Sequence, residues 1–139
     1  LQGIDFTGAT LTHCLMIFSI LKYANLSGAI LDEADLDGAD MTGAVLQGAS
    51  LKGASLRDVL IKGKKGKSKG KSWPTKLTEA NLDGVDLSAA TFRGTGFAGV
   101  NFKGAKLAKT RFENCQIDEE LRRLLDEQGA VVESDAAKS

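Results

Sequence analysis

The chain of 139 residues is 42% hydrophobic and contains one Trp, one Tyr and one Pro, which indicates a single domain. Its 18 Lys and Arg residues balance its 18 Asp and Glu residues, so the net charge of zero gives no general case for nucleic-acid binding. The longest apolar run, residues 14–21, is shorter than the ~20 residues that a membrane helix needs, which excludes a transmembrane segment.

The first residue is Leu1 rather than Met, and it already matches a repeat that runs through most of the chain. We expect a mature chain or a fragment of a longer protein. We expect the protein in the cytoplasm, or in the plastid or thylakoid lumen if a targeting segment has been removed.

Residues 24–56 repeat one five-residue unit without interruption: ANLSG, AILDE, ADLDG, ADMTG, AVLQG, ASLKG and ASL. A helix cannot bury this pattern, because a five-residue step at about 100° per residue turns each Leu by roughly 140° from the last. In an extended chain the first and third places share a face, and the last two places have the composition of a turn. The unit therefore predicts one side of a coil, and its apolar residues are buried only when coils stack. We name the first and third places inward, the second outward, and the fourth and fifth the corner.

This unit resembles the motif of the pentapeptide-repeat family, which is Ala, then Asp or Asn, then Leu, then two variable places often filled by Ser or Thr and Gly. The resemblance implies an all-β solenoid, a right-handed quadrilateral β-helix with one pentapeptide on each side.

Large apolar residues occupy the third place over most of the chain. Counted every five residues, thirteen such positions run from Leu1 to Ile61 and nine more run from Leu77 to Ile117. At four pentapeptides per coil, these predict a β-helix of about five to six coils, which we assign to residues 1–119.

The only insertion that we identify is a Lys- and Gly-rich loop at residues 64–74. Residues 62–76 carry seven Lys and no acidic residue, whereas residues 1–61 and 77–139 have net charges of −4 and −3. The loop could bind an acidic partner or the chain's own acidic faces, a nucleic-acid backbone with Trp73 stacking on a base, anionic lipid, or nothing. We prefer a protein partner over nucleic acid. The candidate residues are Lys64, Lys65, Lys67, Lys69, Lys71 and Trp73.

After Ile117 the five-residue period gives way to a helical one. Asp118 is a plausible N-cap and Gly129 can end the helix, so we expect a short C-terminal α-helical cap at residues 120–130. Residues 131–139 form a tail, for which we expect disorder from Glu133 onward. The family resemblance implies a homodimer through this cap, since members that protect DNA gyrase are thought to dimerise there. The candidate cap or dimer contacts are Leu121, Leu124 and Leu125.

No catalytic constellation is visible, so we expect neither an enzyme nor a cofactor nor a metal. His13 is the only histidine and lies at a corner, where it should face solvent. Cys14 and Cys115 occupy inward places near opposite ends of the solenoid, too far apart for a disulfide, so we predict two free thiols.

Apolar residues at places that should face water indicate a contact surface. They are concentrated in the third to fifth units, and Leu60 is predicted to lie on the same side of the solenoid as Ile20, two coils further along. Either a partner or a second copy covers them, or a missing N-terminal segment or the chain's own tail does. The candidate residues are Leu15, Ile17, Phe18, Ile20, Tyr23 and Leu60.

We therefore predict a non-enzymatic scaffold for protein–protein interaction that uses these apolar residues and the basic loop. The alternative comes from the family resemblance, since members that protect DNA gyrase, a type II topoisomerase, are thought to imitate duplex DNA with an acidic surface. An acidic group in the second coil fits this alternative, although the basic loop and the outward Lys residues late in the chain do not. The group comprises Asp32, Glu33, Asp35, Asp37 and Asp40.

Overall fold

The computed structural model describes residues 1–61 and 71–133, with Leu60 and Ile61 described in their backbone only. Four of the candidate basic residues, Lys64, Lys65, Lys67 and Lys69, lie outside the described residues, as does the tail from residue 134.

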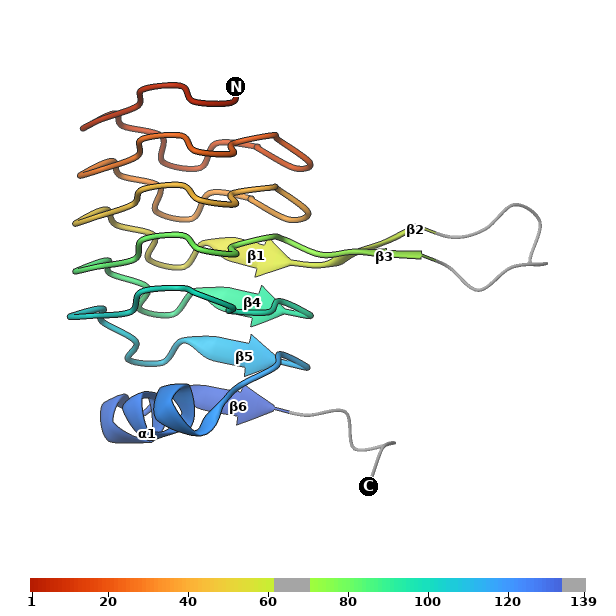
Figure 1. The fold of residues 1–139 in the computed structure, drawn as a ribbon, viewed down its shortest axis with the longest axis vertical. Helices are drawn as coiled ribbons and strands as arrows, with labels where there is room; N and C mark the ends of the chain where they lie inside the picture. The colour runs from red at the N-terminus through yellow and green to blue at the C-terminus, as the bar shows by residue number, and fades with distance from the viewer. Residues whose placement is uncertain (62–70, 134–139) are drawn as a thin grey trace.

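The described chain is a solenoid whose successive coils lie directly on one another (Figure 1). Parallel bridges join residues 20 positions apart, as in the series Asp5, Asn25 and Val45. Because the unit has five residues, an interval of 20 gives four sides per coil. Backbone hydrogen bonds link each coil to the next, for example from Phe6 N to Asn25 O at 2.7 Å. Each side is thus one short strand position in a parallel ladder.

The fifth place of the unit turns the corner with a positive φ. Glycine adopts this conformation without steric cost and fills many corners, such as Gly28 with φ 66°. Each corner is closed by a hydrogen bond across the turn, such as that from Ala24 N to Leu21 O at 3.0 Å. The corner explains how a unit with an odd number of residues keeps every third-place side chain on the inside.

The inward places form the core. In the first coil, Phe6, Leu11 and Met16 are only partly buried, because a neighbouring coil covers them on one side alone. Near the other end, the rings of Phe92 and Phe112 stack at a centroid distance of 5.1 Å. Between these ends the rows of small and large apolar residues are fully buried, among them Leu21, Ala24, Leu26, Leu31, Leu36, Met41, Leu46, Leu51, Leu56, Leu77, Leu82, Leu87 and Phe92.

Six segments of the described residues are long enough to be named strands, and they form two small sheets. A parallel sheet in the order β1-β4-β5-β6 runs along one side of the solenoid, and an antiparallel pair, β2-β3, projects away from it (Figure 1). β6 lies in the segment that we predicted to be a tail, because residues 131–133 pair in parallel with β5. The strands are β1 Ser55–Arg57, β2 Val59–Ile61, β3 Lys71–Trp73, β4 Thr91–Arg93, β5 Arg111–Glu113 and β6 Val131–Glu133.

The insertion is larger than the predicted loop at residues 64–74. The bridge interval is 20 residues between Ile20 and Asp40 but 36 between Asp40 and Lys76, so the insertion adds 16 residues. Ile61 is therefore in β2 and does not continue the inward row, although it falls on the five-residue count. Lys76, rather than Leu60, lies on the side of Ile20 beyond Asp40, so the predicted position of Leu60 was wrong.

Helix α1, Glu119–Gln128, follows the last coil. The Asp118 carboxylate accepts a hydrogen bond from Leu121 N at 2.8 Å, and Gly129 ends the helix with φ 72°. Leu121 and Leu125 belong to the buried core. Within the described residues, no helix has the length and apolar content needed to cross a membrane.

Candidate functional site

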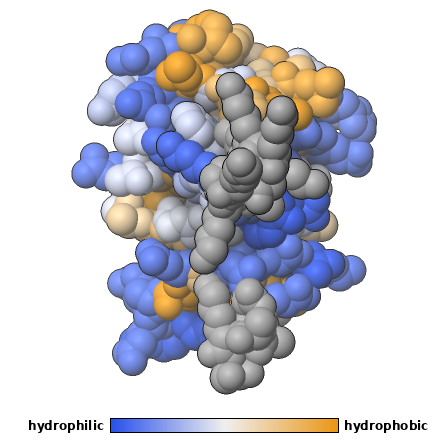
Figure 2. Space-filling view, turned by 90° about the vertical axis from the view of Figure 1, so that its right-hand side faces the viewer, coloured by the Kyte–Doolittle hydropathy of each residue, from blue (hydrophilic) through white to orange (hydrophobic). Residues whose placement is uncertain are grey.

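An apolar surface lies near the N-terminal end of the solenoid, where Figure 2 shows hydrophobic residues gathered in the upper part of the view. Leu15 and Ile20 occupy outward places, and Leu15 is 81% exposed. The corner residues Phe18 and Tyr23 and the fourth-place Ile17 are also exposed. The structure thus brings these five predicted residues together on consecutive sides of the first and second coils. We call these five residues and Trp73 the apolar surface.

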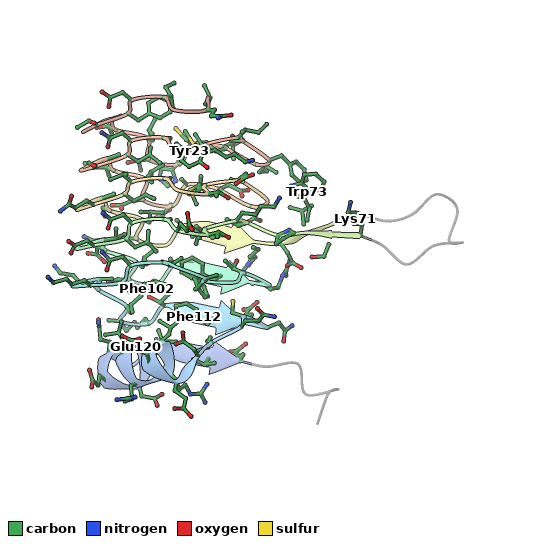
Figure 3. All side chains as sticks on the ribbon, viewed as in Figure 1. Tyr23, Lys71, Trp73, Phe102, Phe112 and Glu120 are labelled. Atoms are coloured by element: carbon green, nitrogen blue, oxygen red, sulfur yellow. The ribbon has the colours of Figure 1, made fainter. Side chains whose placement is uncertain are left out.

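Trp73 joins the inserted hairpin to the residues of the first coil. Its ring meets that of Phe18 edge to face, with centroids 6.1 Å apart. Both rings cover Gly38, where an added Cβ would lie 2.8 Å from the Phe18 ring and 3.2 Å from that of Trp73. The Lys71 ammonium lies 5.6 Å from the centre of the Trp73 ring, within reach of a cation–π contact. The exposed apolar residues of the first two coils and the base of the hairpin therefore form one surface. Figure 3 shows Trp73 and Lys71 along the projecting hairpin.

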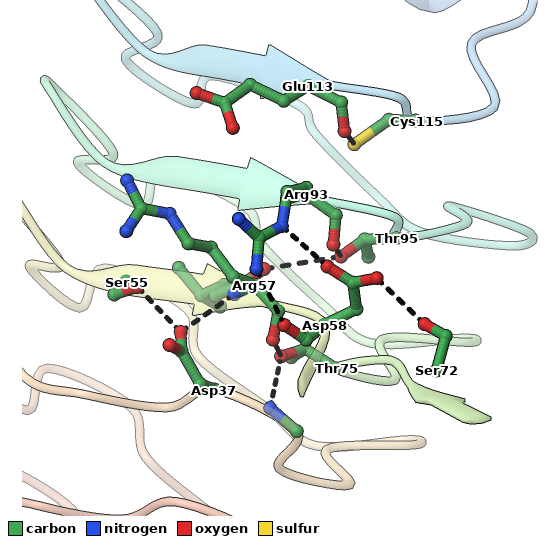
Figure 4. A network of polar contacts seen from close by, with 12 residues as sticks. Asp37, Ser55, Arg57, Asp58, Ser72, Thr75, Arg93, Thr95, Glu113 and Cys115 are labelled. Carbon is green, nitrogen blue, oxygen red and sulfur yellow. Dashed lines mark hydrogen bonds and ion pairs between the residues drawn. The ribbon is translucent and has the colours of Figure 1, made fainter. Parts of the chain in front are cut away.

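Asp58 holds the point where the hairpin leaves the solenoid. Its carboxylate accepts two hydrogen bonds, each of 2.7 Å (Figure 4). One comes from Nε of Arg93, which lies in the next coil, and the other comes from Oγ of Ser72, which lies in β3. Burial alone would raise the pKa of Asp58, but the hydrogen bonds from Arg93 and Ser72 outweigh it and hold the pKa below its ordinary value. The contact with Asp58 raises the pKa of the Arg93 guanidinium in turn.

Thr75 anchors the other end of the hairpin inside the coil. It is 1% exposed, and its hydroxyl accepts a hydrogen bond from Gly38 N at 3.0 Å. The same hydroxyl lies 3.1 Å from the carbonyl oxygens of both Leu36 and Arg57, to one of which it donates (Figure 4). Because Gly38 also supports the rings of Phe18 and Trp73, this anchor fixes the hairpin base against the apolar surface.

Charged side chains border the apolar surface. Lys22 Nζ lies 3.7 Å from an oxygen of Asp40, which neighbours Ile20 on the next coil. Burial would raise the pKa of Asp40, but hydrogen bonds from Thr42 and the charges of Lys22 and Lys76 bring it below its ordinary value. The surface therefore has an apolar centre and a polar rim, which is the composition of a protein interface.

Acidic residues of the second coil serve its turns. Asp35 accepts the N–H of Asp37 at 3.1 Å, and Asp37 in turn accepts the Ser55 hydroxyl at 2.6 Å from the next coil. The described residues contain no group of three or more His, Cys, Asp or Glu side chains that could hold a metal ion. Cys14 and Cys115 are free thiols as predicted, and burial raises the pKa of Cys115.

The remaining candidates are placed less favourably for contact with a partner. Leu121 and Leu125 are buried within the chain, and Leu124 is half-buried. Sequence reasoning missed the role of Gly38 and the Asp58–Arg93 contact. The 20-residue interval between Phe18 and Gly38 was a usable signal, since it places the Gly one coil beyond the aromatic corner.

Comparison with known proteins gives a family and a fold. The model of the family described as "Pentapeptide repeats (8 copies)" matches residues 19–58 and 75–107. No curated protein sequence matches the chain significantly.

Similar solved structures are pentapeptide repeat proteins. The chain is 22% identical to alr5209 from Nostoc PCC 7120, covering 96% of this chain and 100% of that one with a TM-score of 0.58. It is 24% identical to HetL from Nostoc sp. strain PCC 7120, a protein involved in heterocyst differentiation regulation, covering 96% and 60% with a TM-score of 0.52. A protein from the Arabidopsis thaliana thylakoid lumen is 29% identical, with coverage of 95% and 77% and a TM-score of 0.42. The two Nostoc structures show the fold alone.

Proposed function

This chain belongs to the pentapeptide-repeat family, and from that premise we propose that it is a non-enzymatic scaffold that binds a protein partner through its apolar surface and inserted hairpin. Proteins of this family fold as right-handed quadrilateral β-helices, in agreement with the four sides per coil of this chain. We further propose one domain of about five to six coils, interrupted by the insertion and closed by α1 and β6.

The observation that carries the proposal is the contact between Phe18 and Trp73. A chance insertion would not need to pack an aromatic side chain against the most apolar part of the solenoid surface. Both rings remain about half accessible, and aromatic residues at the centre of an apolar patch are typical anchors of protein interfaces.

The charge of the insertion supports a partner with an acidic rim around an apolar centre. Residues 62–76 contain seven Lys and no acidic residue, and Lys71 lies against the Trp73 ring. Positive charge beside an apolar contact raises the rate of encounter with an acidic surface and makes capture sensitive to salt.

The test is affinity capture from the native source with matched variants. Phe18→Asp with Ile20→Asp should abolish capture while leaving the circular dichroism spectrum intact. Ile30→Asp is the control, because Ile30 is an exposed outward residue on another side of the solenoid. Loss of the fold in the double variant would mean that the chain itself covers the apolar surface, and equal loss of capture in the control would remove specificity.

The hairpin has a test of its own. Replacing the seven Lys of residues 62–76 by Ser should weaken capture most at low salt. Unchanged capture would remove the hairpin charge from the proposal, and loss of the captured partner after nuclease treatment would assign nucleic acid instead.

Binding to DNA gyrase stays the second candidate. A DNA mimic needs a continuous negative surface, but Asp37 and Asp40 are engaged in hydrogen bonds or ion pairs within the solenoid. A supercoiling assay decides this candidate: inhibition of gyrase, or protection of gyrase from a poison, would favour it over the scaffold with an acidic partner.

A further inference from the structure

At the C-terminal end of the solenoid, three of the four sides have a partner beyond the last coil. Gln116 forms a bridge with Gly96 on one side, and β6 pairs with β5 on another. On a third side the Gln128 carboxamide replaces a strand: its Oε1 accepts the Leu107 N–H at 2.8 Å, and its Nε2 donates to Ala105 O at 2.8 Å. These partners take the place of a further coil, to which the backbone N–H and C=O groups of the last coil would otherwise bond.

The fourth side, residues 100–104, is left open. One coil earlier, Leu82 N donates to Asn101 O and Gly84 N donates to Lys103 O, both at 2.8 Å. Within the described part of the chain, the equivalent N–H groups of Phe102 and Gly104 have no hydrogen-bond partner, and neither does the carbonyl oxygen of Val100. This side therefore presents two donors and one acceptor in the register of a parallel strand.

A groove of about 880 Å³ runs along this open edge. The last coils line one wall with Phe97 and Phe102, and α1 lines the other with Leu121 and Leu124. Phe102 is only half-buried, whereas its equivalent one coil earlier, Leu82, is 1% exposed. Figure 3 shows Phe102 in the last coils and Glu120 on α1 at this end of the molecule. The groove combines an apolar wall with unpaired backbone, which is what an extended peptide requires.

We propose that this groove binds an extended peptide segment of a partner protein with an acidic residue at its third bound position, which adds one parallel strand to the edge at residues 100–104. This site lies at the other end of the solenoid from the apolar surface and does not depend on the proposed function. The register of the preceding coil sets three guest residues. The first donates its N–H to Val100 O and accepts from Phe102 N, the central one places its side chain on Phe102, and the third accepts from Gly104 N.

The side chains of the edge specify the guest. Asn101 Nδ2 lies 3.3 Å from Asn81 Oδ1 in an amide ladder, which an Asn at the first guest position would continue. Lys103 is exposed and follows Asp83 in the same column, so an Asp or Glu at the third position would lie beside its ammonium group. With a large apolar central residue, the preferred segment is Asn, Leu, then Asp or Glu, as in residues 81–83 of the chain itself.

A synthetic peptide with the sequence of residues 79–86 is therefore the probe, used with the full chain. The expected result is saturable binding, with slowed hydrogen exchange at the amides of Phe102 and Gly104. Absence of binding, or binding without protection of these two amides, would overturn the proposal, since the peptide would then lie elsewhere, for example on the exposed first coil.

Methylation of single peptide nitrogens gives a control that leaves the protein unchanged. An N-methyl group at the first guest residue removes its hydrogen bond to Val100 O and should weaken binding about tenfold. The same group at the central residue faces away from the edge and should change binding little. Equal effects of the two methylations would contradict the proposed register.

A charge exchange tests the role of Lys103. Lys103→Glu should weaken binding of the acidic peptide and strengthen binding of a peptide whose third guest residue is Lys. Lys109→Glu, an exposed corner residue outside the groove, makes the same change in charge and should leave the preference unaltered. A shift of equal size in both variants would assign the effect to net charge and overturn this contact.

Discussion

Phe18 and Phe92 lie on the same side of the solenoid, yet one is 44% exposed and the other is completely buried. The difference comes from their places in the unit, since Phe18 is a corner residue and Phe92 is an inward one. In this fold the place decides burial, and hydrophobicity alone does not. An aromatic residue at a corner therefore contributes little to the core, and its presence at the surface needs an explanation such as a contact.

The largest expected effect is on the buried member of this pair. Phe92→Ala removes a ring that packs against those of Phe97 and Phe112, and it should lower the free energy of unfolding by about 3–5 kcal/mol. Urea unfolding followed by circular dichroism measures the change. A loss of less than about 1 kcal/mol, as expected below for Phe18→Ser, would contradict the conclusion that place in the unit decides the contribution of a Phe to the core.

Gly38→Ala should sharpen the comparison at the corner that supports Phe18. Gly38 has φ 68°, and the added Cβ would collide with the Phe18 ring, so strain and displacement together should cost about 2–3 kcal/mol. Gly48→Ala is the matched control, because Gly48 has φ 69° and no atom lies within 4 Å of its added Cβ. We expect a cost of about 1 kcal/mol there, from the backbone alone. Equal losses of unfolding free energy in the two variants would mean that the rings of Phe18 and Trp73 do not pack closely against Gly38.

Asp58→Asn should reduce stability by about 1–2 kcal/mol at neutral pH, because it weakens the hydrogen bonds from Arg93 and Ser72. The folded-state pKa of Asp58 lies below its ordinary value of about 4, so its contribution is complete above that value. The contribution is lost as the pH falls through the lowered pKa. Unfolding curves between neutral and acidic pH should therefore show a smaller acid loss for Asp58→Asn than for the parent chain, and parallel losses would refute this role.

The smallest effect on stability is expected for Phe18→Ser. Its ring is half exposed, so unfolding should change by less than about 1 kcal/mol, while capture of the partner is lost. Because the ring of Phe18 covers part of Trp73, the emission of the single Trp should move to longer wavelength. A large loss of stability would show that the apolar surface is part of the core.

The sequence predicted the parts of the molecule that follow the five-residue period. The burial of Leu26, Leu36 and Leu51 and the exposure of Leu15 and Tyr23 follow from place alone. The C-terminal helix follows from a cap residue and a change of period, and α1 spans Glu119–Gln128 against the expected 120–130.

The errors arose where the period gives a false match or no signal. Ile61 is apolar and falls on the five-residue count, but the chain has already left the coil at Val59 to form β2. The hairpin base depends on contacts between residues far apart in sequence, such as Asp58 with Arg93, and no local pattern encodes them. β6 was missed because Val131–Glu133 is a single strand without a repeat, and only its pairing with β5 defines it.

Asp58 and Thr75 hold the two ends of the insertion in the solenoid, so the insertion is structurally separable from the coils. Excision of residues 59–74 would leave Leu56 and Leu77 five residues apart and return the bridge interval to 20. The two cut ends belong to adjacent corner and inward places, so the shortened chain runs through Leu56, Arg57, Asp58, Thr75, Lys76 and Leu77 without a break in the five-residue period. The solenoid is thus a scaffold with one insertion site, at which residues 59–74 can be removed or exchanged for another binding segment without redesign of the coils.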